Sequence, residues 1–115
     1  MSAILFHNPR CSKSREALRL LEESNFAFDV HLYLKEGVSV AAVEKLCSAL
    51  GEKTPWAFIR KKEAVCKELG LSVETGRTKL IQAISDNPIL LERPILLHGK
   101  KAVVGRPPEL VLELV

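Results

Sequence analysis

The sequence has few aromatic residues: phenylalanine, tyrosine and tryptophan together make up 5% of its 115 residues. Proteins that bind single-stranded nucleic acid stack the bases on aromatic side chains, so this scarcity argues against such a function. The net charge of +3 is also too small for a nucleic-acid footprint, although it suits a small anionic ligand. The core must be mainly aliphatic, and the 47% hydrophobic content is enough for one domain, expected over residues 1–115.

Cysteines are few and widely spaced, at positions 11, 47 and 66. An odd number without any Cys-x-x-Cys or Cys-x-x-His pair predicts neither a disulfide framework nor a zinc site, so we expect no bound metal. Free thiols fit a reducing compartment.

Long hydrophobic runs are also missing, since crossing a bilayer takes about 18 apolar residues or more. The apolar run near the start, Ala3–Phe6, is too short for the core of a signal peptide and has no basic leader. We therefore expect a soluble, cytoplasmic protein that does not contact a membrane.

The order of the predicted elements indicates a mixed α/β fold. Apolar spacing predicts a βαβ unit, then several helices, a β-hairpin and a final helix. The predicted segments are strands at 3–6 and 26–34, helices at 12–25, 39–50, 55–59, 63–69 and 78–86, a hairpin at 95–104 and a helix at 107–114. This is the layout of a thioredoxin-like fold with a helical insertion between the βαβ half and the C-terminal hairpin and helix. That fold enters its third strand through a cis-proline, which predicts a cis bond between Arg93 and Pro94.

Cys11 falls in the turn between the first strand and the first helix. Unpaired backbone N–H groups and the helix dipole favour an anion at a helix start. Arg10, Lys13 and Arg15 add positive charge nearby, so we expect a thiol with a lowered pKa that acts as a nucleophile. An inert, packed cysteine is the alternative, and the polar residues on both sides of Cys11 argue against it.

Three neighbours of Cys11 are candidates for supporting roles. His7 could favour the thiolate as an imidazolium, or could end the strand with a hydrogen bond to a loop carbonyl. Asn8 is better explained as shaping the turn than as performing chemistry. Ser14 occupies the position at which a dithiol enzyme carries its resolving cysteine, so an external thiol must complete any reaction.

Counting residues excludes a phosphatase loop of the Cys-x5-Arg type. That loop needs an arginine six residues after the cysteine, and Ala17 stands there. Arg15, four residues after Cys11, either supports the site or is a solvated charge on the helix surface.

The run from His7 to Arg15 resembles the HNPxCxxSR signature of the arsenate reductase (glutaredoxin) family, including its shorter members. The resemblance extends along almost the whole chain and implies that Cys11 is the catalytic nucleophile. Arginine suits an oxyanion site because its planar, bidentate donors keep their proton. The resemblance implies three anion-binding arginines, each in its expected local motif: Arg60, Arg93 and Arg106.

The resemblance also implies a reaction. The Cys11 thiolate would attack the arsenic of arsenate, glutathione would then form a mixed species, and glutaredoxin would complete the reduction to arsenite. No tightly bound cofactor is expected, and glutathione would be a co-substrate.

Two alternatives stay open on the sequence. Spx-like transcription factors share this fold and bind RNA polymerase, but they use a Cys-x-x-Cys switch, and Ser14 takes the place of its second cysteine. The same Cys11 chemistry could also serve a thiol oxidoreductase with a substrate other than arsenate. Cys47, on the apolar stripe of a predicted helix, and Cys66 match no functional position of the family, so we expect both to be packed.

Overall fold

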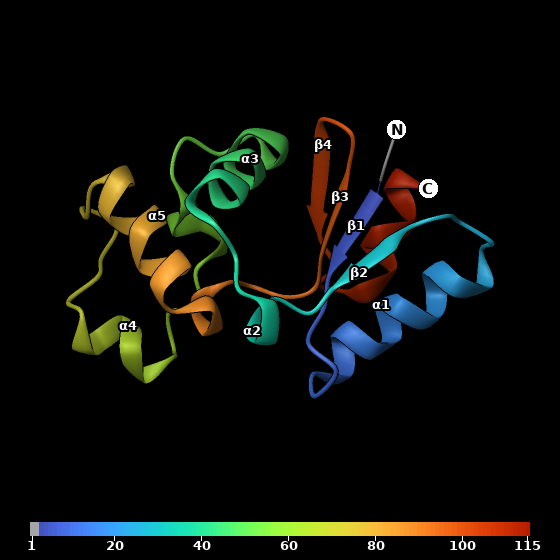
Figure 1. Ribbon diagram of the computed structural model, residues 1–115, viewed down its shortest axis with the longest axis horizontal. Coiled ribbons are helices and arrows are strands. Elements are labelled where there is room, and N and C mark those ends of the chain that lie inside the picture. Colours follow the sequence, from blue (N-terminus) through green and yellow to red (C-terminus); the bar gives the residue numbers. More distant parts are fainter. Residues whose placement is uncertain (1–2) are drawn as a thin grey trace. The chain divides into compact units, whose positions relative to one another are not determined.

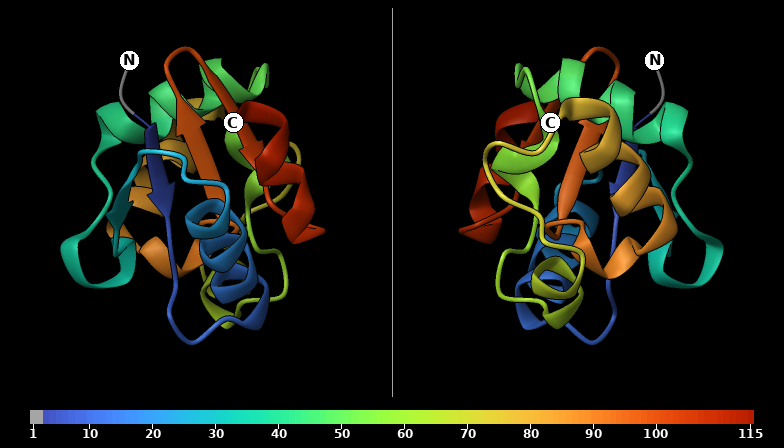
Figure 2. Two further views of the ribbon diagram at one scale, coloured as in Figure 1. Left: turned by 90° about the vertical axis from the view of Figure 1, so that its right-hand side faces the viewer. Right: turned by 90° about the vertical axis from the view of Figure 1, so that its left-hand side faces the viewer.

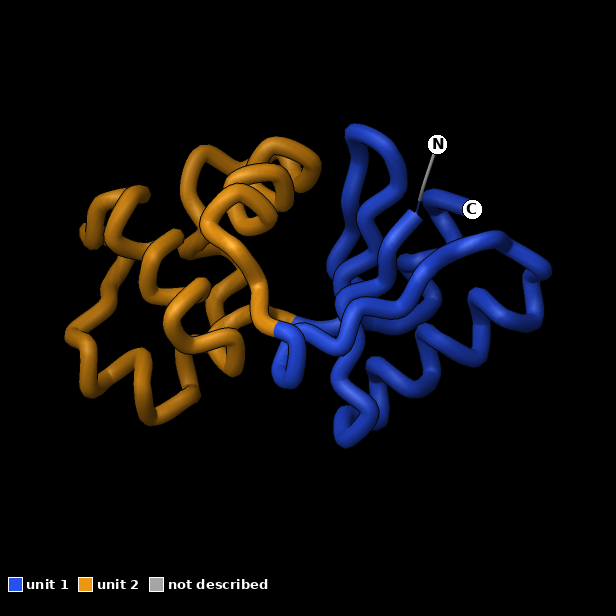
Figure 3. The backbone as a smooth tube through the Cα atoms, viewed as in Figure 1, with its two compact units in different colours: residues 1–36, 93–115 blue, residues 37–92 orange. Residues whose placement is uncertain are grey.

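The computed structural model describes residues 3–115, so Met1 and Ser2 of the predicted domain lie outside the described residues. The chain divides into two units (Figure 3). Unit 1 comprises the residues up to Glu36 together with Arg93–Val115, and unit 2 comprises Gly37–Glu92. Unit 2 is therefore inserted in the sequence of unit 1, at the place predicted for the helical insertion.

Unit 1 contains a four-stranded sheet in the order β2-β1-β3-β4 (Figure 1). The first strand, β1 (Ala3–Phe6), runs parallel to β2 (Asp29–His31) and antiparallel to β3 (Ile95–His98). The fourth, β4 (Lys101–Val104), pairs antiparallel with β3. Gly99 allows the tight turn between them because its φ of 63° lies in the left-handed region. The predicted first strand and hairpin are thus confirmed.

Two helical segments, α1 (Ser12–Glu23) and η3 (Pro108–Leu114), cover one face of this sheet (Figure 2). Leu5 of β1 lies directly opposite Leu96 of β3 in the register, and both are fully buried beneath these helices. Burying one such leucine stabilises the fold by about 1.5–3 kcal/mol. The buried residues of this layer are Ala3, Leu5, Ala17, Leu21, Leu96 and Val111.

The second strand is shorter than the predicted range of 26–34. β1 is only four residues long, and it pairs with no more of β2 than Asp29–His31. The chain then enters a helical turn, α2 (Tyr33–Glu36), in which the N–H groups of Lys35 and Glu36 donate to the Leu32 carbonyl at 3.0 and 2.8 Å. The prediction of a long strand was therefore wrong at both ends.

Two proline bonds of unit 1 are cis. The Arg93–Pro94 bond is cis as predicted, and the Arg106–Pro107 bond is cis as well, which was not predicted. The closing helix η3 begins at Pro108 and has 3-10 rather than α-helical hydrogen bonding.

Unit 2 is helical, as predicted. In α3 the Ser39 side chain caps the helix start by accepting a hydrogen bond from the Ala42 N–H at 3.1 Å. An isolated antiparallel bridge pairs Ile59, in the middle part of the unit's sequence, with Leu91 near its end. Nowhere in residues 3–115 is a helix long and apolar enough to span a bilayer. The elements of unit 2 are α3 (Val40–Leu50), η1 (Pro55–Phe58), α4 (Ala64–Glu68), α5 (Arg77–Asp86) and η2 (Pro88–Leu90).

Candidate active site

A single buried hydroxyl, that of Ser14, ties the loop after β1 to the first turn of α1. Ser14 is 0% exposed. Its Oγ lies 2.7 Å from Nδ1 of His7 and accepts a hydrogen bond from the Asn8 N–H at 3.0 Å. Both His7 and Asn8 are themselves buried, so Ser14 satisfies polar groups that water cannot reach.

The loop closes around Asn8. Its side-chain Oδ1 accepts from the Arg10 N–H, and its backbone carbonyl accepts from the Cys11 N–H, each at 3.0 Å. The exposed Arg15 reaches back from α1 and donates through Nη1 to the Pro9 carbonyl at 2.9 Å. Asn8 therefore shapes the turn, in agreement with the interpretation of its sequence position.

Cys11 is the N-cap residue of α1, with extended backbone angles (φ −94°, ψ 123°), and its side chain is half-buried. Burial raises the pKa of its thiol. The Ser14 backbone N–H, the Arg93 side chain, the Lys13 backbone N–H and the charge of Arg93 favour the thiolate, and together they outweigh burial and lower the pKa. Cys11 is therefore placed to act as a thiolate at a helix start.

His7 has a lowered pKa, chiefly because it is buried and secondarily because of the charge of Arg15. Glu22 and a hydrogen bond with Ser14 act in the opposite direction and are outweighed. The neutral imidazole is thus favoured at neutral pH, and the ring contacts the Ser14 hydroxyl instead of a loop carbonyl. Neither role considered for His7 from the sequence describes this arrangement.

Two of the three arginines singled out in the sequence, Arg93 and Arg106, lie in unit 1. Arg93 hydrogen-bonds Cys11 through its side chain, and Arg106 donates through Nη1 to the Arg93 carbonyl at 3.2 Å. Gly105 allows the chain segments that carry Arg93 and Arg106 to approach each other. Its N–H donates to the Pro94 carbonyl at 2.8 Å, and a side chain would not fit there because a Cβ would lie 2.8 Å from the Pro94 ring. The Arg93 and Arg106 backbones are therefore held side by side.

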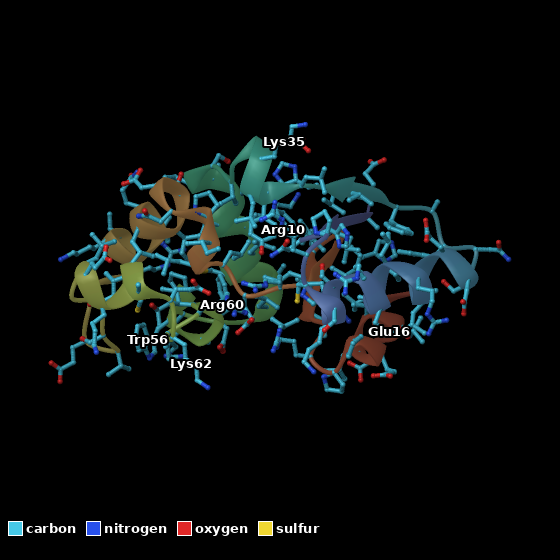
Figure 4. The ribbon with its side chains drawn as sticks, turned by 90° about the horizontal axis from the view of Figure 1, so that it is seen from below. Arg10, Glu16, Lys35, Trp56, Arg60 and Lys62 are labelled. Carbon is cyan, nitrogen blue, oxygen red and sulfur yellow. The ribbon has the colours of Figure 1, made fainter. Side chains whose placement is uncertain are left out.

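Arg60 belongs to unit 2, in the turn after η1, between Trp56 and Lys62 along the chain (Figure 4). Its guanidinium donates through Nε to Glu63 and through Nη1 to Glu92, each at 3.1 Å. Neither glutamate was predicted from the sequence to be a site residue. The three-residue spacing to Glu63 was a usable signal, but Glu92 is 32 positions away and only the fold brings it to Arg60.

A model of the ArsC family matches residues 6–114. The chain belongs to the ArsC family. It is 42% identical over 115 residues to a Haemophilus influenzae protein named arsenate reductase, covering 99% of each chain. It is also 46% identical over 112 residues to the Escherichia coli uncharacterized protein YfgD, covering 96% of this chain and 94% of that one.

Solved structures agree with this assignment. The arsenate reductase from Vibrio cholerae superposes with a TM-score of 0.93 at 42% identity, covering 100% of this chain and 98% of that one. The predicted fold class, a thioredoxin-like α/β fold with a helical insertion before the C-terminal hairpin and helix, is confirmed for this ArsC-family protein.

The other two cysteines of this ArsC-family protein are packed, as expected: Cys47 is 1% exposed and Cys66 is 3% exposed. Burial raises the pKa of Cys47, and the nearby carboxylates of Glu44 and Glu52 raise it further against the opposing charge of Arg77. Across residues 3–115, no group of three or more histidine, cysteine or acidic side chains is placed to hold a metal ion.

Proposed function

We propose that this ArsC-family protein is an oxidoreductase that reduces arsenate, or a similar oxyanion, through Cys11, in the cytoplasm. The observation that carries the proposal is the pairing of Cys11, at the start of α1 with a lowered pKa, with the guanidinium of Arg93. A thiolate beside a fixed cation is what attack on an anionic substrate requires, because the cation offsets the repulsion between them. Relatives named arsenate reductase support arsenate as the substrate.

The proposed reaction uses Cys11 and two external thiols. The Cys11 thiolate forms a sulfur–arsenic bond, and one oxygen of arsenate takes up protons and leaves as water. Glutathione displaces a second oxygen as water, which gives a mixed species with Cys11 and glutathione both bonded to arsenic(V). Because Ser14 stands where a resolving cysteine would be, the thiol of glutaredoxin attacks the glutathione sulfur. The arsenic–glutathione bond breaks with its electron pair left on arsenic, which becomes arsenic(III), and glutaredoxin and glutathione form a mixed disulfide. Water then releases arsenite and regenerates Cys11.

The oxyanion is held by three arginines in this proposal: Arg60, Arg93 and Arg106. Arg60 comes from unit 2 and the other two from unit 1. His7, Asn8, Ser14 and Arg15 support the site by fixing the Cys11 loop.

The test is consumption of NADPH by the purified protein with arsenate, glutathione, glutaredoxin and glutathione reductase. We expect turnover that depends on arsenate, on glutaredoxin and on Cys11, and that is absent in Cys11→Ser. Turnover with a disulfide substrate but not with arsenate would leave a thiol oxidoreductase of different specificity. Capture of RNA polymerase without any turnover would instead support the regulator alternative.

A further inference from the structure

The guanidinium of Arg60 is held between two carboxylates. Glu63 accepts from Nε and Glu92 accepts from Nη1, each at 3.1 Å. The three side chains are 21%, 27% and 24% exposed, so all three are mostly buried. One arginine with two glutamates leaves a local net charge of −1, and a single glutamate would have been enough to neutralise the arginine.

The backbone fixes both carboxylates relative to Arg60. The Arg60 N–H donates to the Leu90 carbonyl at 2.7 Å, and the Glu92 N–H donates to the Phe58 carbonyl at 2.9 Å, on either side of the Ile59–Leu91 bridge. The Glu63 N–H donates to the Arg60 carbonyl at 3.1 Å and closes a turn. A backbone hydrogen bond therefore joins Glu63 to Arg60, and the Ile59–Leu91 bridge and its two flanking hydrogen bonds hold the Glu92 backbone beside that of Arg60.

The two glutamates that hold Arg60, Glu63 and Glu92, form a clamp that affects an oxyanion bound at Arg60 in two opposing ways. Occupying Nε and Nη1 fixes the plane of the guanidinium, which removes the loss of rotamer freedom that a long side chain otherwise suffers on binding. The surplus negative charge repels the anion, but water reaches side chains that are about a quarter exposed and screens this repulsion. We therefore expect orientation to outweigh repulsion.

We propose that Glu63 and Glu92 are positioning residues, which set the affinity of the site for an oxyanion by holding Arg60 in one orientation. This inference rests on the assignment of Arg60 to the oxyanion in the proposed function. The glutamates do not contact the oxyanion themselves and act only through Arg60.

The test measures arsenate binding by titration calorimetry on the full chain carrying Cys11→Ser, so that no turnover occurs. Glu92→Ala should weaken binding by about tenfold, and Glu92→Gln should restore most of it, because the amide oxygen still accepts from Nη1. In an Arg60→Ala background, Glu92→Ala should have no effect. The matched control is Glu44→Ala, which removes an exposed ion pair with Arg77 in the same unit and should leave binding unchanged.

In the protein with Cys11 intact, Glu92→Ala should raise the KM for arsenate and leave kcat nearly constant, which loss of stability alone would not do. Glu63→Ala and Glu63→Gln give a second, independent pair if Glu92→Ala does not fold.

Tighter binding in the alanine variants would mean that repulsion dominates, and an equal loss in the Arg60→Ala background would mean that the glutamates act elsewhere. Either result overturns the inference, as does the absence of any arsenate binding. Arsenate binding with the expected variant pattern, but without reduction, would overturn the proposed function and leave the clamp supported.

Discussion

The two longest helices of the protein, one in each unit, begin with different chemistry. In unit 2, α3 starts at Ser39, whose hydroxyl accepts a hydrogen bond from the Ala42 N–H. In unit 1, α1 starts at Cys11, whose side chain makes no capping hydrogen bond, and the backbone N–H groups of Ser14 and Lys13 lower the pKa of its thiol. The same orphan N–H groups therefore stabilise a helix in one unit and favour a thiolate in the other.

The cysteines of the two units also differ in the direction in which the fold shifts the pKa of the thiol. Cys11 is half-buried at a helix start beside Arg93 and has a lowered pKa, whereas Cys47 is buried within α3 and has a raised pKa. Both belong to helical segments, so the position along the helix and the neighbouring charge decide whether the pKa of the thiol is lowered or raised.

The largest expected effect would test this contrast directly. Cys11→Ser should reduce arsenate-dependent turnover to the uncatalysed background, because a serine hydroxyl does not ionise near neutral pH. Cys47→Ser and Cys66→Ser should retain turnover in the same NADPH-coupled assay. Loss of turnover in either of these variants, with the fold intact by circular dichroism, would contradict the single-cysteine assignment.

Arg93→Ala should have the next largest effect. It removes a hydrogen bond and a charge from the Cys11 thiolate, so the pH midpoint of Cys11 alkylation by iodoacetamide should rise. Arsenate binding should weaken by about 1.5–3 kcal/mol, roughly 10- to 150-fold. Arg19→Ala is the control, because Arg19 pairs with Glu16 and Glu23 on the exposed face of α1. An unchanged alkylation midpoint in Arg93→Ala would remove Arg93 from the thiolate site.

The two helix starts can also be compared through their serines. Ser14→Ala leaves the buried Asn8 N–H without its partner and should lower the free energy of unfolding by about 1–3 kcal/mol. Ser39→Ala loses an exposed cap and should cost about 1 kcal/mol. Urea denaturation measures both, and a larger loss for Ser39→Ala would contradict the buried role of Ser14.

The smallest effect concerns pH. Because the fold lowers the pKa of His7 from its ordinary 6.5, the stability associated with neutral His7 is complete above about pH 6.5 and is lost as the pH falls toward the folded pKa. One group contributes at most about 1.4 kcal/mol per pH unit to this slope. His7→Gln should flatten the dependence measured by urea denaturation between pH 6.5 and pH 5. An unaltered slope in His7→Gln would assign it to other groups.

Much of the fold follows from local signals in the sequence. The apolar run of β1, the apolar spacing of α1 and the hairpin of β3 and β4 each depend on residues a few positions apart, and each prediction is confirmed. The predicted second strand was wrong because its length depends on β1, which is distant in sequence and offers few partners. The 3-10 geometry of η3 likewise had no local signal that distinguished it from an α-helix.

The candidate site likewise has one part that the sequence predicts and another part that only the tertiary structure determines. Cys11 was identifiable from the sequence because a strand, a turn and a helix start occur within a few residues, and the thiol chemistry of a helix start needs nothing more. Which groups surround the thiol was decided by tertiary structure: the sheet brings Arg93 to Cys11, and burial makes Ser14 the partner of His7. The bridge between Ile59 and Leu91 brings Glu92 to Arg60 across 32 positions. Hydrogen bonds and charge interactions act over a few ångströms. The distance in space between two side chains that are far apart in the sequence is set by the folded backbone, so the number of residues between them does not predict it.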